Sequence, residues 1–225
     1  AGASVVAVEI DRNLAEHLRA RFRAALGAAQ ETTPGALRLV EGDALAIPVG
    51  ELVDAPYDLV ANLPYSVTSP ILHHVLGGEP RPERLVLMLQ REVAERIAAR
   101  PGSMSYVSVF VQYHAEVRVA QVVPASAFEP APAVESAILV GETRARRLGP
   151  AAEDEFWRLV QAGFRERRKM LHNVLPRQLP WVGRDRIVAA LGRAGIAADR
   201  RPQTLSVGEW LDLAQTLGPL ERASE

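Results

Sequence analysis

The chain has 225 residues, of which 48% are hydrophobic and 24% are charged, an ordinary globular composition that argues against disorder. No apolar run approaches the ~18 residues needed to cross a bilayer, and the first residues lack the pattern of a secretory signal. The absence of cysteine excludes disulfides and thiolate metal sites, so a reducing, cytoplasmic location is expected.

The first predicted unit is a strand, a carboxylate and a helix. Residues 4–8 are a short apolar run, and residues 14–26 follow a helical period with Asp11 as the expected N-cap. Glu9 and Ile10 stand at the tip of the strand. A carboxylate in that place can accept hydrogen bonds from both hydroxyls of a ribose, while the alternative for Glu9 is a solvated loop acid.

A second strand is expected at residues 36–40, and a polar turn follows it. Gly42 permits a tight turn, and Asp43, with Ala44 beside it, can accept a hydrogen bond from an adenine amine. This turn comes one strand after Glu9 and one strand before Asn62. We therefore expect all three polar tips at the same edge of one sheet.

The third strand, residues 57–61, ends in a tetrapeptide suited to presenting a planar amine to an electrophile. The side-chain oxygen of Asn62 and the backbone carbonyl of Leu63 can each accept one amine hydrogen. Pro64 restricts the turn, and Tyr65 offers a face on which an extruded base can stack. The alternative is an ordinary Asn-Pro turn with a half-buried tyrosine.

Helices and strands continue to alternate after this tetrapeptide. Phe128 lies in a proline-stiffened loop, residues 128–132, and is either a second face for the target base or a plug over the sheet edge. The predicted helices are residues 68–76 and 90–99, and the predicted strands are residues 85–89, 107–113, 117–123 and 134–140.

The last part of the chain is expected to be helical and basic. Residues 141–225 carry 15 Arg and Lys against 11 Asp and Glu, although the whole chain has a net charge of −1. Helices are expected at residues 156–164, 184–191 and 207–217. A basic turn follows the first of these helices and can hold phosphates; the alternative is a solvated helical face. Its cations are Arg165, Arg167, Arg168 and Lys169.

Six stretches, in order and at compatible spacing, resemble the ribosomal RNA adenine N6,N6-dimethyltransferases of the KsgA family. They are residues 5–11, 42–44, 62–72, 90–96, 128–132 and 164–173. The resemblance implies an α/β Rossmann-like class I methyltransferase domain over residues 1–145 and a helical RNA-binding domain over residues 146–225. It also implies an amino-terminally truncated chain. The family's first strand and glycine-rich turn would lie before residue 1, so the strands at residues 4–8 and 57–61 are expected to have unpaired edges.

The resemblance further implies S-adenosylmethionine as methyl donor, without a metal. Glu9 and Ile10 would lie at its ribose, Asp43 and Ala44 at its adenine, and Asn62 next to both donor and acceptor. The substrate would be two adjacent adenosines in a hairpin loop near the 3′ end of 16S ribosomal RNA, in the assembling 30S subunit, and the enzyme would act as a monomer.

Three rival readings of the sequence are an Erm-type methyltransferase of large-subunit RNA, an RNA-binding assembly factor without catalysis, and a nicotinamide-dependent Rossmann enzyme. The first shares the tetrapeptide chemistry. The last uses Glu9 on a ribose but leaves residues 62–65 without a role, so it explains less of the chain.

Overall fold

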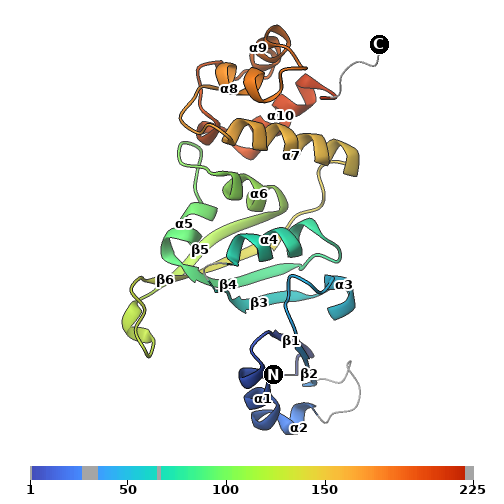
Figure 1. The fold of residues 1–225 in the computed structure, drawn as a ribbon, viewed down its shortest axis with the longest axis vertical. Coiled ribbons are helices and arrows are strands. Elements are labelled where there is room, and N and C mark those ends of the chain that lie inside the picture. Colours follow the sequence, from blue (N-terminus) through green and yellow to red (C-terminus); the bar gives the residue numbers. More distant parts are fainter. Residues whose placement is uncertain (1, 27–34, 65–66, 221–225) are drawn as a thin grey trace. The chain divides into compact units, whose positions relative to one another are not determined.

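The computed structural model describes residues 2–26, 35–64 and 67–220 (Figure 1). The chain divides into two compact units, and each is considered by itself. Unit 1 comprises Ala1–Asp58 and Ser66–Glu83, and unit 2 comprises Leu59–Tyr65 and Arg84–Glu225.

Unit 1 is built on two parallel strands. β1 (Val5–Glu9) pairs with β2 (Leu37–Glu41) so that Glu9 lies opposite Glu41. Asp11 caps the helix that follows β1, because its carboxylate accepts the backbone N–H groups of Asn13 and Leu14, which confirms the predicted helix start. The helices of the unit are α1 (Arg12–Arg21), α2 (Arg23–Leu26), α3 (Val49–Leu52) and α4 (Thr68–Gly77).

Unit 2 contains a four-stranded sheet in the order β3-β4-β6-β5. Along β4 the side chains of Leu85, Leu87 and Leu89 are buried and alternate with more exposed positions, so one face of the strand lies in the core. β6 runs antiparallel to both of its neighbours. The strands are β3 (Asp58–Asn62), β4 (Arg84–Gln90), β5 (Ala115–Val123) and β6 (Ser136–Thr143).

Among the described strands the three polar tips do not share one sheet, whereas the expected unpaired edges of β1 and β3 are present. In the described part of the chain β1 pairs with β2 alone and β3 with β4 alone, in two separate sheets. Val5 and Val60, on the two strands concerned, are 47% and 74% exposed. No described strand pairs with both β1 and β3, and without such a strand their backbone groups cannot join one hydrogen-bonded ladder.

The predicted strand at residues 107–113 is a helix, α6 (Tyr106–His114). Ser105 begins it with a reciprocal capping box to Ser108. The run is buried nearly all round, including Val109, Phe110 and Tyr113. A fully buried run of this length carries neither period clearly, so the apparent alternation in the sequence was misleading.

The C-terminal helices enclose a hydrophobic core centred on the fully buried Trp210. Met104, Val109 and Tyr113 belong to the same core, so α6 shares it with the C-terminal helices. A domain boundary between residues 145 and 146 stays a prediction. The C-terminal helices are α7 (Pro150–Phe164), α8 (Leu171–Gln178), α9 (Arg184–Arg193) and α10 (Val207–Leu217). Unit 2 also contains α5 (Arg91–Ile97), which directly follows β4.

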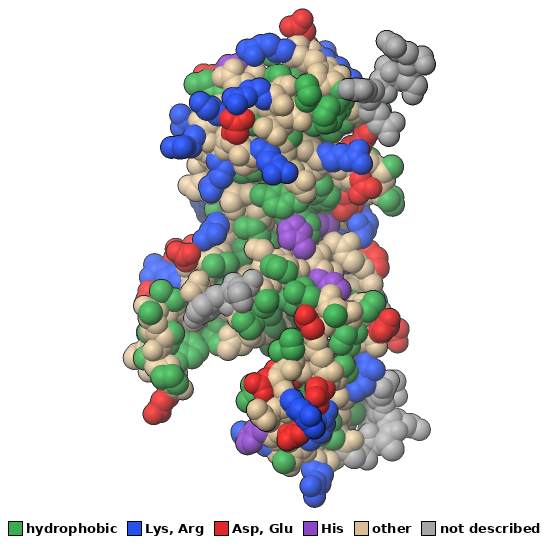
Figure 2. Space-filling model, viewed as in Figure 1, with side chains coloured by type: hydrophobic (Ala, Val, Ile, Leu, Met, Phe, Trp, Pro, Cys, Tyr) green, Lys and Arg blue, Asp and Glu red, His purple; other side chains and the backbone are tan. Residues whose placement is uncertain are grey.

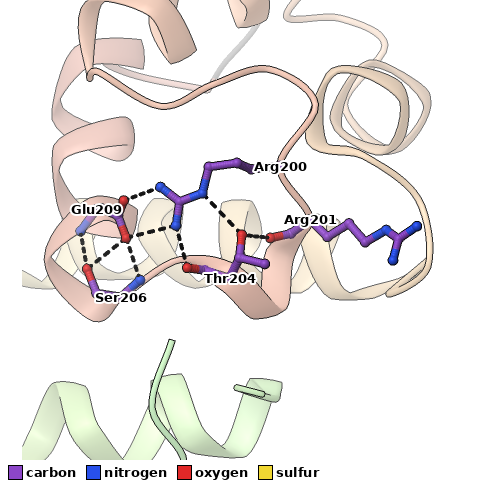
Figure 3. Close-up of polar contacts among 5 residues, drawn as sticks. All are labelled: Arg200, Arg201, Thr204, Ser206 and Glu209. Atoms are coloured by element: carbon purple, nitrogen blue, oxygen red, sulfur yellow. Dashed lines mark hydrogen bonds and ion pairs between the residues drawn. The ribbon is translucent and has the colours of Figure 1, made fainter. Parts of the chain in front are cut away.

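A polar network fixes the segment that leads into α10 (Figure 3). The guanidinium of Arg200 pairs with Glu209 and donates through Nε to the Thr204 hydroxyl at 3.2 Å. Glu209 also accepts the Ser206 N–H at 2.7 Å, and the Ser206 hydroxyl accepts the Glu209 N–H in return. The hydrogen bond from Arg200 is the main cause that lowers the pKa of Glu209. The network therefore joins a helix cap to an ion pair.

The contact between α7 and α10 predicts the effect of a single methyl group. A Cβ at Gly163 would lie 2.5 Å from Cη2 of Trp210, whereas a Cβ at the exposed Gly192 of α9 would meet nothing within 4 Å. We expect Gly163→Ala to lower the free energy of unfolding by about 1–3 kcal/mol through overpacking. Gly192→Ala is the matched control and should raise it by up to about 1 kcal/mol, because alanine favours the helix. Urea unfolding measures both; equal effects would contradict the close packing.

Candidate functional site

Two polar strand tips meet in unit 1, as the sequence predicts for Glu9 and Asp43. β1 and β2 end in register, and the N–H of Gly42 donates to the carbonyl of Glu9 at 2.9 Å. The turn that carries Asp43 and Ala44 therefore begins beside the tip of β1. A Cβ at Gly42 would lie 3.2 Å from Cδ1 of Ile47, which shows how tight the turn is.

Each of these carboxylates has one oxygen fixed by the local backbone. Oε1 of Glu9 accepts the Asp11 N–H at 2.8 Å, and Oδ1 of Asp43 accepts the Leu45 N–H at 2.9 Å. The second oxygen of each makes no hydrogen bond to a described residue. Two oriented acceptors beside Ile10, an apolar side chain that is 68% exposed, fit the hydroxyls, amine and ring face of a nucleoside.

The acceptor tetrapeptide lies at the end of β3, in unit 2. Asn62 is exposed, whereas the Leu63 side chain is buried and its N–H donates to the carbonyl of Met88 in β4 at 3.2 Å. Pro64 is exposed. The position of Leu63 is thus set by core packing and by a backbone hydrogen bond together, which leaves Asn62 at a fixed, accessible strand tip. Tyr65 lies outside the described residues.

Phe128 belongs to the connection between β5 and β6, residues 124–135, which we call the Phe128 loop. The loop includes the turn η1 (Ala125–Ala127), and the N–H of Phe128 donates to the carbonyl of Ala125 at 3.2 Å. The Phe128 side chain is half-buried. At the other end of the loop, β6 begins with Ser136 opposite Gln90, the last residue of β4.

The last residues of β4 therefore lie between two predicted acceptor elements. β3 is its neighbour on one side and β6 on the other, so Leu63 and the end of the Phe128 loop flank the same end of one strand. The structure brings Asn62, Leu63 and Pro64 to this sheet end together with the end of the loop. Asn62 and the Glu9–Asp43 pair lie on different sheets.

The predicted basic turn joins α7 to α8 and exposes its cations. Arg165, Arg167, Arg168 and Lys169 are all exposed, and none forms an ion pair with a described residue. Glu166 instead pairs with Arg177 at 3.3 Å, and its carbonyl accepts the Lys169 N–H. Figure 2 shows Lys and Arg side chains over this helical part of unit 2. Four unpaired cations on a turn suit a polyanion.

An ion pair that the sequence analysis did not predict lies at the end of β4. Arg91 follows β4 and Glu135 precedes β6, and the two side chains are joined at 2.8 Å. Residues 90–96 are one of the six matching stretches, which was the only signal for Arg91.

In the described ranges no cluster of three His, Cys, Asp or Glu side chains suits a metal ion, and no helix there is long and apolar enough to span a membrane.

A model of a family described as ribosomal RNA adenine dimethylase matches residues 2–218. The chain belongs to this family. It is 42% identical to the ribosomal RNA small subunit methyltransferase A of Synechococcus sp. (strain JA-3-3Ab), over 96% of this chain and 74% of that relative. It is 38% identical to the protein of the same name from Dehalococcoides mccartyi (strain ATCC BAA-2266 / KCTC 15142 / 195), over 92% of this chain and 68% of that relative.

Two solved structures resemble this fold. The 23S rRNA methyltransferase ErmE has a TM-score of 0.71 at 26% identity, over 95% of this chain and 82% of that one. A dimethyladenosine transferase from Plasmodium falciparum has a TM-score of 0.75 at 24% identity, over 93% and 80%, and supports the fold alone. The predicted family and enzyme class are confirmed, and membership implies S-adenosylmethionine as methyl donor. The roles of single residues stay predictions.

The predicted role of Glu9 can be tested against its register partner. Glu9→Gln should weaken S-adenosylmethionine binding about 10- to 100-fold, because a charge-assisted hydrogen bond contributes roughly 1.5–3 kcal/mol. Glu41→Gln is the matched control: Glu41 lies opposite Glu9 but is exposed and paired with Arg19 at 2.9 Å, so donor affinity should stay within twofold. Calorimetric titration measures both. Equal affinity in the two variants would remove Glu9 from the donor site.

Proposed function

We propose that the protein transfers methyl groups from S-adenosylmethionine to the N6 amines of two adjacent adenosines, in a hairpin loop near the 3′ end of 16S ribosomal RNA. The observation that carries this proposal is the similarity, over more than nine-tenths of the chain, to curated enzymes named for small-subunit RNA. That substrate belongs to the assembling 30S subunit, and we propose that the protein acts on it in the cytoplasm as a monomer.

The acceptor chemistry is proposed to lie with Asn62 and Leu63. An exocyclic adenine amine is a poor nucleophile, because its lone pair is delocalised into the ring. Two acceptors, the Asn62 side-chain oxygen and the Leu63 carbonyl, would each bind one N6 hydrogen and favour a pyramidal nitrogen. The hydrogen bond between Leu63 and Met88 supports this role, because an acceptor held on a strand needs little reorganisation.

The proposed transfer balances without a strong base. When bound, S-adenosylmethionine supplies a methyl group on an electrophilic sulfonium. The N6 lone pair forms a bond to the methyl carbon as the carbon–sulfur bond breaks, and the nitrogen becomes strongly acidic. It then loses its proton to Asn62 or to water. In the second round one N–H remains for the same acceptors, so the site keeps one of its two hydrogen bonds to the amine.

The remaining residues would hold the RNA. Phe128 is proposed to stack on the extruded base, as is Tyr65, and such stacking contributes about 1–3 kcal/mol per base. The half-buried state of Phe128 supports this, since part of the residue stays accessible. The exposed basic turn would bind phosphates: Arg165, Arg167, Arg168 and Lys169.

A second candidate is methylation of large-subunit RNA, favoured by the similarity to ErmE over 95% of the chain. The chemistry at N6 would be the same, and only the RNA would differ. The higher identity to small-subunit enzymes, 38–42% against 26%, makes this the second choice.

Substitution of Asn62 tests the proposed chemistry. Asn62→Ala should lower kcat for methyl transfer to unmodified small subunits by about 100-fold or more, since an oriented acceptor is lost from the transition state. Affinity for S-adenosylmethionine should change far less than kcat. The control is Asn13→Ala, an exposed asparagine on α1, with full activity expected. Incorporation of labelled methyl groups measures the rate. Unchanged transfer in Asn62→Ala would remove Asn62 from the mechanism.

A further inference from the structure

An ion pair closes one end of the Phe128 loop. Arg91 donates its backbone N–H to the carbonyl of Glu135 at 2.9 Å and its Nη1 to Oε2 of the same residue at 2.8 Å. Its Nε donates to Glu95, one turn along α5, at 2.8 Å. The guanidinium is thus oriented by its own helix. Arg91 binds the last residue of the loop twice, once through its backbone N–H and once through the guanidinium.

The rest of the loop has few constraints of its own. Its first half is held by β5 and by the η1 turn, in which Ala127 donates to Pro124 and Phe128 to Ala125. From residue 129 to residue 134 the backbone makes no hydrogen bond to any part of the chain that the structure describes. Among the described residues, the second half of the loop is therefore held to the rest of the chain by hydrogen bonds only at Glu135. In Figure 1 the loop extends beyond the sheet.

The same strand end holds the acceptor tetrapeptide. The carbonyl of Met88 receives the Leu63 N–H, and Arg91 follows three residues later, where β4 passes into α5. A change at Arg91 can therefore alter the loop while the Leu63–Met88 hydrogen bond stays in place. The two hydrogen bonds, to Glu95 and to Glu135, also hold the pKa of Arg91 above its ordinary value, so it stays charged at any working pH.

We propose that Arg91 and Glu135 are positioning residues for methyl transfer, which set the Phe128 loop against the target base at the end of β4. The inference rests on the proposed function, in which Phe128 stacks on that base. An exposed ion pair adds little to global stability, so its loss should loosen the loop and leave the fold intact.

A neighbouring ion pair provides the control. Arg96 pairs with Glu92 on α5 at 3.0 Å, with side chains 48% and 74% exposed, against 47% and 45% for Arg91 and Glu135. Both arginines belong to the same helix and pair with a glutamate in solvent. The ion pair between Arg96 and Glu92 includes no residue of the Phe128 loop, so Arg96→Gln measures the effect of losing a surface charge alone.

The test combines exchange and kinetics on the whole protein. In Arg91→Gln, hydrogen–deuterium exchange of the hydrogen-bonded loop amides, those of Ala127 and Phe128, should be about 5- to 10-fold faster than in the wild type. KM for unmodified small subunits should rise about 5- to 20-fold, with affinity for S-adenosylmethionine within twofold. Arg96→Gln should change neither. The exchanged pair, Arg91→Glu with Glu135→Arg, should recover part of both losses, because the contact between residues 91 and 135 is restored with its charges reversed while the contact to Glu95 is lost.

Each failure has a separate meaning. Unchanged loop exchange in Arg91→Gln, or an equal effect of Arg96→Gln, would overturn the positioning role while leaving the proposed function in place. Faster loop exchange with unchanged kinetics would likewise overturn it. Absence of methyl transfer to small subunits by the wild-type protein would overturn the proposed function and the positioning role together.

Discussion

Hydrogen bonding along both edges of β4 is the constraint on which the proposed acceptor side of this enzyme depends. One edge receives the Leu63 N–H at Met88, and the other continues past Gln90 and Ser136 to the contact between Arg91 and Glu135. Elements separated by many residues are in this way placed at one end of one strand. Groups fixed to a strand keep their geometry better than groups on a free loop, as an in-line transfer requires.

The proposed donor side depends on a different constraint, the parallel register of β1 and β2. Because Glu9 lies opposite Glu41, the turn after β2 begins at the tip of β1, and Asp43 comes next to Glu9. One oxygen of each carboxylate accepts a backbone N–H, and the other makes no hydrogen bond to a described residue. Backbone geometry, more than side-chain packing, prepares these two acceptors.

Local signals in the sequence were sufficient for some of these features. The strand tips at Glu9, Asp43 and Asn62 and the helix cap at Asp11 follow from residue type and period, and the first two tips do lie together. Residues 107–113 were wrongly predicted as a strand, because a run buried on nearly all sides has no clear period. Sheet membership and the Arg91–Glu135 pair, 44 residues apart in sequence, depend on long-range pairing that composition does not encode.

We propose that the end of β4 holds an adenine amine of small-subunit RNA for methylation. Incubation of the protein with labelled S-adenosylmethionine and unmodified 30S or 50S subunits, with mass spectrometry of the RNA to place the methyl groups, tests this directly. We expect N6,N6-dimethyladenosine at two adjacent positions near the 3′ end of the small-subunit RNA. Methylation confined to large-subunit RNA, or methyl groups on no RNA at all, would contradict it.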